Sequence, residues 1–236
     1  MKKVAAGITM NWERDPGFKE NTPGGWKFCL NGNYVAMLER GGVVPLGMLP
    51  GGGPGDLLDA VDFLVLTGGG DPDPALYGVE VDGAVDVMRE RPSWEMELYR
   101  TARRAGIPVL GICMGLQIVG IAEGSRLVQD IASRVENPLN HHGKPGFPEF
   151  HPVTLIRGTA LHRFLGDSVT VGSFHHQALE TVPAGFHVAG YSDDGVIEAM
   201  ESDDGMVLAV QWHPERDSTG DAVLEAVLGI VKGAGS

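Results

Sequence analysis

The first half of the chain alternates short apolar runs with stretches whose apolar residues recur at helical spacing. The run Val61–Leu66 is apolar throughout, as expected of a strand buried on both faces of a sheet. Trp94, Leu98 and Ala102 recur every four residues, and Gly106 then ends the helical pattern. Such alternation is typical of a parallel sheet flanked by helices. The strands expected here are 4–10, 43–46, 61–66 and 108–112, and the helices are 34–41, 93–105 and 116–122.

The second half of the chain changes to closely spaced short strands. Asp194-Gly195 and Asp204-Gly205 separate apolar runs and are typical of tight hairpin turns. A last helix is expected from about Ser218, because apolar residues then recur on one helical stripe. The sequence therefore predicts an α/β fold, in which a mostly parallel sheet flanked by helices carries an antiparallel extension. The strands expected here are 153–156, 169–171, 187–191, 196–200 and 206–211.

Two long segments lack strong periodicity, and both are rich in glycine, proline and charge. Asn11–Phe28 and Val135–Phe150 are therefore expected to be functional loops that select the ligand. The first carries Trp12, Glu13 and Phe18, a mixture that can stack on an apolar group or pair with a charged one. The plain alternative is a solvated surface loop.

Composition places the chain among globular proteins with a sizeable core. It has 236 residues, of which 43% are hydrophobic, and no apolar run approaches the ~20 residues that cross a bilayer. No internal repeat or long linker divides it, so residues 1–236 are expected to form one domain. The first residues lack the apolar core of a signal peptide. Two cysteines, Cys29 and Cys113, exclude a disulfide framework, and we expect a cytoplasmic protein that interacts with no membrane.

The chain is acidic, with 18 Lys and Arg against 31 Asp and Glu and a formal net charge of −13. It contains no run of basic residues, so a nucleic-acid partner is not expected. The same charge attracts a cationic ligand more readily than an acidic one.

One cysteine stands where a buried strand is expected to turn sharply into a helix. Cys113 lies between Gly111 and Gly115, in the pattern Gly-x-Cys-x-Gly at the end of the strand at 108–112. This is the thiol counterpart of the nucleophile elbow, in which glycines leave room for the turn. The N-terminus of the following helix favours the thiolate. A small buried hydrophobe is the commoner role of a free cysteine, and we assign Cys29, which has apolar neighbours and no glycine frame, to that class.

A thiolate nucleophile needs a base, and His213 is the strongest candidate among the eight histidines because it ends an apolar strand. Pro214 biases His213 toward extended backbone, which places Glu215 on the same side of the chain. Glu215 can then accept the imidazole N–H and fix its tautomer. The alternative is a surface histidine beside a solvated glutamate.

Three glycines, at positions 68–70, follow the strand at 61–66. Without side chains, their backbone N–H groups can approach a ligand closely, as an oxyanion hole requires. They match no nucleotide-binding pattern, because Pro72 and Pro74 interrupt the helix that would have to follow. A second glycine cluster, at 51–55, is expected to form an ordinary turn.

Two histidine pairs, His141-His142 and His175-His176, raise the question of a metal site. Adjacent side chains in an extended chain point to opposite faces, so each pair would offer one ligand. No Cys-x-x-Cys or His-x-x-x-His spacing supports zinc. The sequence therefore predicts no metal and no cofactor.

Four segments together resemble class I glutamine amidotransferase domains. They are GGGDPDP at 68–74, GICMGLQ at 111–117, SFHHQ at 173–177 and QWHPE at 211–215. The chain looks most similar to the free-standing γ-glutamyl-γ-aminobutyrate hydrolase branch, a cysteine peptidase-like family of omega peptidases. The likeness runs from about Val4 to Val231 with the motifs in the family's order, and it implies a three-layer, flavodoxin-like fold.

The resemblance also implies roles for individual residues and a small-molecule γ-glutamyl substrate. Cys113, His213 and Glu215 would form a catalytic triad, with the thiolate attacking the γ-amide carbon. Backbone N–H groups would form the oxyanion hole, and other residues would bind the glutamyl part. The oxyanion hole is implied at Gly69 or Gly70 and Met114, and glutamyl binding at Gln117, Ser173, Phe174, and His175 or His176. Such domains are commonly homodimers.

The chain departs from the pattern of that branch at three places. Met114 stands where Arg usually follows the nucleophile, Pro92 replaces an Asp, and Glu123 replaces the first of two glycines. The triad positions are kept, so acyl transfer remains the expectation. The identity of the leaving amine does not follow from the resemblance.

These features lead to three functional hypotheses. The first is a hydrolase that cleaves γ-glutamyl amides through a Cys113 thioester. The alternative is a glutaminase subunit that delivers ammonia to a separate synthetase. A third, of a different class, is a binding or regulatory protein with a silent triad. Turnover of γ-glutamyl amines by the isolated chain separates the first two, and failure of a thiol-reactive substrate analogue to label any cysteine would favour the third.

Overall fold

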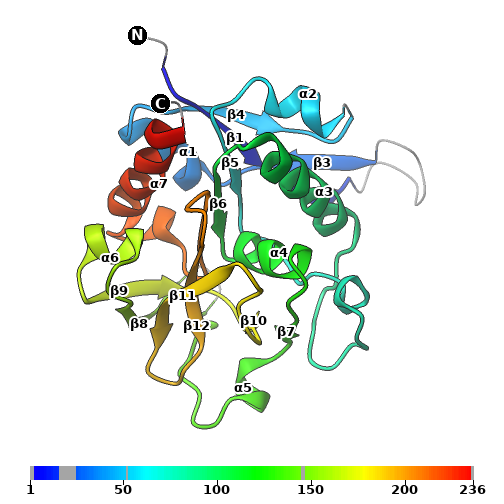
Figure 1. The fold of residues 1–236 in the computed structure, drawn as a ribbon. Helices are drawn as coiled ribbons and strands as arrows, with labels where there is room; N and C mark the ends of the chain where they lie inside the picture. The colour runs from blue at the N-terminus through cyan, green and yellow to red at the C-terminus, as the bar shows by residue number, and fades with distance from the viewer. Residues whose placement is uncertain (1–2, 16–24, 52, 145–146, 235–236) are drawn as a thin grey trace.

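A nine-stranded mixed sheet forms the framework of the protein, in the order β4-β1-β5-β6-β13-β12-β11-β8-β9 (Figure 1). The computed structural model describes the chain apart from residues 1–2, 16–24, 52, 145–146 and 235–236. Neighbours from β4 to β13 pair in parallel, and those from β13 to β9 pair antiparallel. In sheet order the strands are β4 (Val44–Met48), β1 (Ala5–Thr9), β5 (Phe63–Leu66), β6 (Val109–Ile112), β13 (Val207–Val210), β12 (Ile197–Ser202), β11 (Phe186–Ser192), β8 (Glu149–Leu155) and β9 (Ser168–Ser173).

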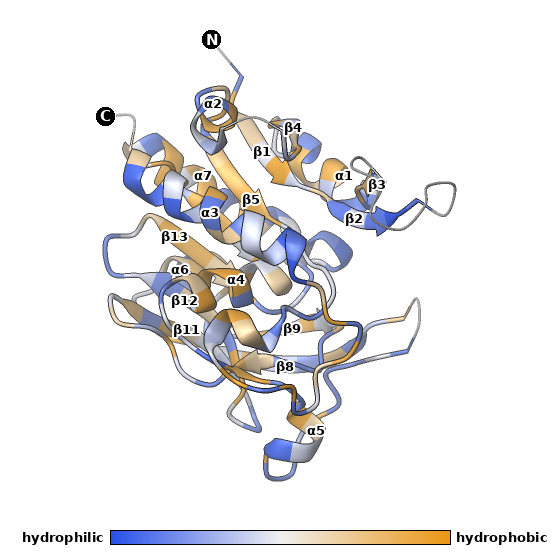
Figure 2. Ribbon diagram, turned by 90° about the vertical axis from the view of Figure 1, so that its right-hand side faces the viewer, coloured by the Kyte–Doolittle hydropathy of each residue, from blue (hydrophilic) through white to orange (hydrophobic). Residues whose placement is uncertain are grey.

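Alternating side chains of the central strands build two hydrophobic cores, one on each face of the sheet. In β5, Phe63 and Val65 belong to one core, and Leu64 and Leu66 belong to the other. Because successive side chains of a strand point to opposite faces, a strand covered on both sides must be apolar at every position. Figure 2 shows β5 and β13 as hydrophobic along their length.

Helices cover both faces of this sheet and complete a three-layer arrangement (Figure 1). The pair α1 and α7 contributes to the core that contains Phe63, and the pair α3 and α4 to the core that contains Leu64. Among the described residues, no helix has both the length and the apolar character that a membrane crossing requires. The helices are α1 (Gly32–Arg40), α2 (Pro54–Leu58), α3 (Glu90–Ala105), α4 (Met114–Ala122), α5 (Ile131–Arg134), α6 (Ala160–Leu165) and α7 (Gly220–Ala234), with 3₁₀ helices η1 (Pro74–Tyr77) and η2 (Pro214–Arg216).

The predicted fold class, a mostly parallel sheet with an antiparallel extension, is confirmed, although two elements differ from expectation. The strand β13 lies in the middle of the sheet, where it pairs in parallel with β6 and antiparallel with β12. It therefore joins the two parts of the sheet. The helix α3 begins at Glu90 instead of Ser93, and Pro92 lies in its first turn. Proline is tolerated there because no hydrogen-bond partner is available for an N–H at that position.

The predicted loop at Asn11–Phe28 is wrong at its described ends, which form a hairpin. The strand β2 (Asn11–Arg14) pairs antiparallel with β3 (Trp26–Cys29). Trp12 is buried and packs against three aromatic rings, because alternate residues of β2 point to opposite faces. Its partners are Trp26, Phe28 and Trp94, at ring-centroid distances of 5.6, 5.5 and 5.8 Å. Phe18 lies outside the described residues.

Two other irregular segments contain short regular elements. The glycine cluster at 51–55 does not form only a turn, because Gly53 caps α2 and Pro54 is its first residue. Within the predicted loop at 135–150, Lys144 and Phe147 form an isolated bridge, and β8 already begins at Glu149. A further two-stranded ribbon pairs β7 (Leu127–Val128) with β10 (Ala178–Leu179).

The helix α4 lies very close to the carboxyl ends of β5 and β6, because two glycines lack side chains. A Cβ atom on Gly111 would lie 2.9 Å from the carbonyl oxygen of Gly115. A Cβ atom on Gly115 would overlap the carbonyl oxygen of Leu66. Both obstacles are backbone atoms of packed elements and cannot turn aside as a flexible side chain can. The sharp turn between β6 and α4 therefore depends on both glycines.

We expect Gly115→Ala to destabilise the fold by about 1–3 kcal/mol, because the added methyl group must displace backbone of the packed core. The matched control is Gly229→Ala in α7, where nothing lies within 4 Å of the added atom. The control should raise stability by about 0.5–1 kcal/mol, since alanine restricts the unfolded chain. Urea unfolding of both variants measures the difference. Equal effects of the two substitutions would contradict the close-approach explanation.

Candidate active site

Three polar segments meet at one edge of the sheet because they follow neighbouring parallel strands. The glycines at 68–70 follow β5, Cys113 follows β6, and His213 follows β13. These strands are adjacent in the order β5-β6-β13, and the carboxyl ends of parallel strands lie at the same edge. Open α/β sheets bind their ligands at this edge.

Cys113 occupies a strained turn between β6 and α4. Its backbone has φ +53° and ψ −107°, a region that residues with a side chain rarely adopt. The Cys113 N–H donates to the carbonyl oxygen of Val210 at 2.8 Å, which ties the turn to β13. Since α4 begins at Met114, the unpaired N–H groups and positive dipole end of this helix lie beside the sulfur.

His213 and Glu215 are in hydrogen-bond contact. The Nδ1 atom of His213 lies 2.8 Å from Oε1 of Glu215, whose side chain is fully buried. His213 is followed directly by the short helix η2, and the bend at Pro214 brings the two side chains together. Burial opposes a charged imidazole, but the neighbouring Cys113 thiolate and Glu215 carboxylate outweigh it and raise the pKa of His213 to about 10. The arrangement thus favours the charged form of the His213 imidazole.

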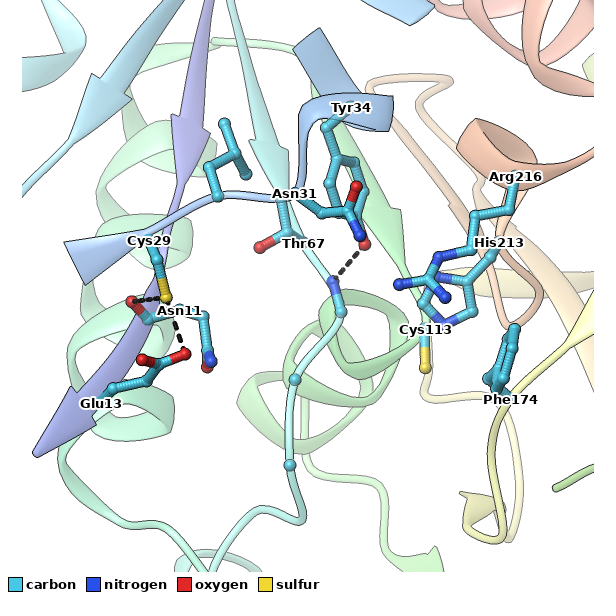
Figure 3. Close-up of a pocket in the computed structure, with 14 residues that line it drawn as sticks. Asn11, Glu13, Cys29, Asn31, Tyr34, Thr67, Cys113, Phe174, His213 and Arg216 are labelled. Carbon is cyan, nitrogen blue, oxygen red and sulfur yellow. Dashed lines mark hydrogen bonds between the residues drawn. The ribbon is translucent and has the colours of Figure 1, made fainter. Parts of the chain in front are cut away.

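The glycine segment presents backbone N–H groups beside Cys113. A Cβ atom on Gly68 would lie 2.8 Å from Cε1 of His213, so a side chain there would press on the imidazole. The Gly68 N–H donates to the hydroxyl of Tyr34 at 3.0 Å (Figure 3). Within the described chain, the N–H groups of Gly69 and Gly70 donate to no protein acceptor. They are available to a ligand, together with the N–H of Met114 at the start of α4.

A buried arginine that the sequence interpretation overlooked holds this segment in place. The guanidinium of Arg91 donates to the carbonyl oxygens of Thr67 and Gly68 at 3.2 and 3.0 Å, and to the side-chain oxygen of Asn11 at 3.0 Å. It also forms a fully buried ion pair with Glu95 at 2.8 Å. Burial raises the pKa of Glu95, and the charge of Arg91 opposes this. The available signal was an i, i+4 Arg–Glu pair on the inner side of a helix.

Cys113 lies where two cavities meet. The larger, of about 450 Å³, extends from Cys113 and His213 to Glu13 and Cys29 on the opposite side (Figure 3). The smaller, of about 210 Å³, lies between Cys113 and Gln117 on one side and the segments at 69–71 and 174–177. Both cavities are lined by Gly69, Gly70, Cys113 and Phe174. A substrate can therefore extend in two directions from the sulfur atom.

Four of the five residues expected to bind the glutamyl group line the smaller cavity: Gln117, Phe174, His175 and His176. Phe174 also packs edge-on against His213, with ring centroids 5.9 Å apart. His176 contacts Asp71 at 2.9 Å, and this hydrogen bond raises the pKa of His176. Ser173 differs, because it is fully buried and its hydroxyl donates to the carbonyl oxygen of His141 at 2.8 Å.

The apolar role expected of Cys29 is wrong. Cys29 is only partly buried, lines the larger cavity, and donates its thiol to Oε1 of Glu13 at 3.0 Å (Figure 3). The carboxylate of Glu13 raises the pKa of Cys29, so the thiol stays protonated. Trp12 does not line this cavity, whereas Asn11 and Glu13 on the other face of β2 do. The alternation of side chains along β2 explains the difference.

Comparison with known proteins finds a matching family and several similar proteins. Residues 6–215 match the family described as Peptidase C26. A Mycobacterium tuberculosis protein named "Putative glutamine amidotransferase Rv2859c" is 43% identical over 164 residues, which are 69% of this chain and 53% of that protein. The chain thus spans about half the length of that relative. The γ-glutamyl-γ-aminobutyrate hydrolase of Escherichia coli O157:H7 is 32% identical over 173 residues, 69% of this chain and 67% of the hydrolase.

A solved structure supports the fold. The Thermoplasma acidophilum protein described as a "putative gmp synthase subunit a protein" superposes with a TM-score of 0.68, at 18% identity, over 99% of this chain and 96% of that one. Because the sequence identity is low, the likeness concerns the fold alone. It agrees with the parallel core and the antiparallel extension described above.

We expect iodoacetamide at pH 7 to label Cys113 about tenfold or more faster than Cys29, because alkylation requires the thiolate. Cys113 lies beside an imidazolium and a helix N-terminus, whereas Cys29 hydrogen-bonds to a carboxylate. Mass spectrometry of the labelled peptides over time gives both rates. In Glu13→Gln the rate at Cys29 should rise while that at Cys113 stays constant. Equal rates at the two cysteines in the unmodified chain would contradict this assignment.

Proposed function

The chain belongs to the Peptidase C26 family, and we propose that it hydrolyses the amide bond of a γ-glutamyl amine through a thioester on Cys113. One observation carries the proposal: Cys113 lies at the junction of two cavities, beside His213 and the N–H groups of Gly69 and Gly70, which have no acceptor within the described chain. Acyl transfer needs a nucleophile between an acyl pocket and a leaving-group cleft. Since both halves of the chain contribute, residues 1–236 act as one hydrolase domain in this proposal.

The proposed reaction has two steps, formation of a thioester and its hydrolysis. The Cys113 thiolate attacks the γ-carbonyl carbon, the imidazolium of His213 donates its proton to the amine nitrogen, and the C–N bond breaks to leave a γ-glutamyl thioester. Neutral His213 then removes a proton from water, whose oxygen attacks the thioester carbon. The C–S bond breaks, glutamate leaves, and the thiolate–imidazolium pair is restored. Glu215 holds the imidazole tautomer and stabilises its charged form throughout.

The developing oxyanion is bound by backbone N–H groups in this proposal. Gly69 or Gly70 supplies one donor and Met114 the other, because each donates to no acceptor within the described chain or its helix. These donors are fixed before the substrate binds: the Gly68 carbonyl is hydrogen-bonded by Arg91, and the Gly68 N–H by Tyr34. Donors that need no reorganisation contribute most to transition-state stabilisation.

The two cavities suggest where each part of the substrate lies. The smaller one, with Gln117 and the Asp71–His176 pair, offers polar groups to the amino acid end of the glutamyl group. The larger one would then receive the leaving amine. Glu13 places a carboxylate in that cleft, and Arg216 lies near its Cys113 end, where its guanidinium stacks on Phe174 at 4.9 Å. The larger cavity has a volume of about 450 Å³, which suits an amine far larger than ammonia. This volume favours hydrolysis of γ-glutamyl amines over a glutaminase role.

A variant series tests the proposed roles. Cys113→Ala and His213→Ala should lose nearly all glutamate release from γ-glutamyl amines at neutral pH. Glu215→Gln should keep measurable activity, because it orients the base and does not itself accept the proton. Cys29→Ala should keep kcat/KM within about tenfold, a barrier change of ~1.4 kcal/mol. Intact-mass spectra of acid-quenched reactions should show a glutamyl adduct that is absent from Cys113→Ala.

Two outcomes would contradict this series. An active Cys113→Ala variant, or equal losses at both cysteines, would refute the nucleophile. Rapid turnover of glutamine that appears only when a synthetase is added, without turnover of γ-glutamyl amines by the isolated chain, would support the ammonia-supplying alternative instead.

Glu13 should discriminate among leaving amines. In Glu13→Gln we expect kcat/KM to fall about two- to fivefold for γ-glutamyl derivatives of amines that carry a second, positive charge, since the attraction acts at a solvated site. Derivatives of neutral amines should change little. The matched control is Glu39→Gln on the exposed side of α1, which should affect neither class. A uniform fall across all substrates would mean that Glu13 acts on the structure of the cleft and not on the amine.

A further inference from the structure

A buried cluster of three histidines and a glutamate lies behind the smaller cavity. The side chains of His141, His151, His175 and Glu198 are each at most 5% exposed. One atom from each residue faces a common centre, and these four atoms lie within 4.8 Å of one another. Oε1 of Glu198 is 3.1 Å from Nδ1 of His141, 3.6 Å from Nε2 of His151 and 3.5 Å from Nε2 of His175.

The outward-facing nitrogen of each imidazole is engaged by an acceptor. Nε2 of His141 lies 2.9 Å from Oδ2 of Asp194. Nδ1 of His151 and Nδ1 of His175 lie 3.3 and 2.9 Å from the carbonyl oxygens of Pro152 and Gln177. Because carboxylate and carbonyl oxygens only accept, each ring must carry its proton on the outer nitrogen. The inner nitrogens of the three rings therefore face the carboxylate of Glu198 at the centre of the cluster.

The centre of the cluster thus gathers three imidazole nitrogens and a carboxylate, all of which can coordinate a cation. Among the described residues, no hydrogen-bond partner is available to the inner nitrogens of the three histidines or to either oxygen of Glu198. A buried acceptor without a partner is costly, and a buried unpaired carboxylate more so. A cation at the centre would neutralise the carboxylate and contact one atom of each of the four residues.

We propose that this cluster binds a structural zinc ion. Three imidazole nitrogens and one carboxylate oxygen are ligands that zinc accepts in a four-coordinate, tetrahedral site. Ligands bound at about 2.0–2.1 Å with tetrahedral angles lie about 3.4 Å apart, close to the 3.1, 3.6 and 3.5 Å from Glu198 to the three rings. The four residues are at most 5% exposed, and such burial is typical of a structural site.

The surroundings of the cluster suit a metal site. Metal-bound histidines usually donate their second N–H to a carboxylate or carbonyl oxygen, which fixes the ring orientation. Asp194 does this for His141, and it is itself held by the hydroxyl of Ser192 at 2.6 Å and the N–H of Leu139 at 2.9 Å. The ion would join four segments that are distant in the sequence, including the wall of the smaller cavity at His175.

Spacing along the chain could not reveal this cluster. Each histidine pair offers one residue to the cluster, as expected: His141 and His175 face the centre, whereas the rings of His142 and His176 contact each other elsewhere. The remaining ligands come from the strands β8 and β12. Only the pairing of strands in the sheet brings them close to the other two ligands. The prediction of no metal depends on the absence of short, regular ligand spacings along the chain, and the proposed site has no such spacing.

The test is the metal content of the full chain, purified without a histidine tag and without chelator. Elemental analysis should find about one zinc ion per chain, and removal by a strong chelator should lower the melting temperature reversibly. Cobalt(II) added to the metal-free chain should give the visible absorption of a tetrahedral nitrogen- and oxygen-ligated site. His151→Gln should lose the ion, whereas the control His187→Gln, an exposed histidine on β11, should keep it.

A second pair of variants keeps the test decisive if His151→Gln fails to fold. Asp194→Asn should weaken zinc affinity about 10- to 100-fold, whereas Asp193→Asn, its exposed neighbour, should not. A chain that folds without metal, shows no chelator effect on melting and binds no zinc on titration would refute the proposal. Equal zinc content in His151→Gln and the unmodified chain would refute it too, since the ion would then be bound at the surface. None of these readouts depends on hydrolase activity.

Discussion

The contact between Gly115 of α4 and the carbonyl of Leu66 at the end of β5 is the constraint on which the rest of the site depends. Only a glycine allows a helix to approach the end of a neighbouring strand so closely. The approach forces the chain between β6 and α4 into one tight turn and places Cys113 at its apex with a positive φ. It also brings the N-terminus of α4 next to the glycine segment that follows β5. The proposed nucleophile and the backbone N–H groups proposed to bind the oxyanion are thus positioned by a single packing contact.

The N–H groups of Gly69 and Gly70 donate to no acceptor within the described chain, and the glycine segment is held mainly through its carbonyl groups. Arg91 binds the carbonyl oxygens of Thr67 and Gly68, and its own charge is balanced by Glu95. Breaking a buried pair of this kind by removing one partner costs several kcal/mol, because the other charge remains buried. Tyr34 supplies the only acceptor that the segment uses on its N–H side within the described chain. These hydrogen bonds hold the loop in place and leave the N–H groups of Gly69 and Gly70 available to a ligand.

The antiparallel half of the sheet lies behind the candidate site. It delivers the segment 173–177 to the smaller cavity through β9, and it carries β8 and β12, whose His151 and Glu198 meet behind that segment. The parallel half carries the groups that are proposed to react, and the antiparallel half forms part of the wall of the smaller cavity. Because β13 pairs with both β6 and β12, the two halves share one continuous sheet.

Local patterns in the sequence determined the class of fold, the elbow at Cys113 and the pairing of His213 with Glu215. These features depend on residues that are close in the chain: apolar runs of fixed period, glycines two residues from a cysteine, and a proline between two polar residues. Only the tertiary structure decided the contacts between distant segments. It moved Cys29 from the core to a cavity, turned Trp12 away from that cavity and buried Arg91 beneath the glycine loop. It also gathered four acceptors from four segments at one buried point. The physical reason is that a sequence specifies which face of an element is apolar, whereas the neighbours of its polar residues depend on which elements pack together.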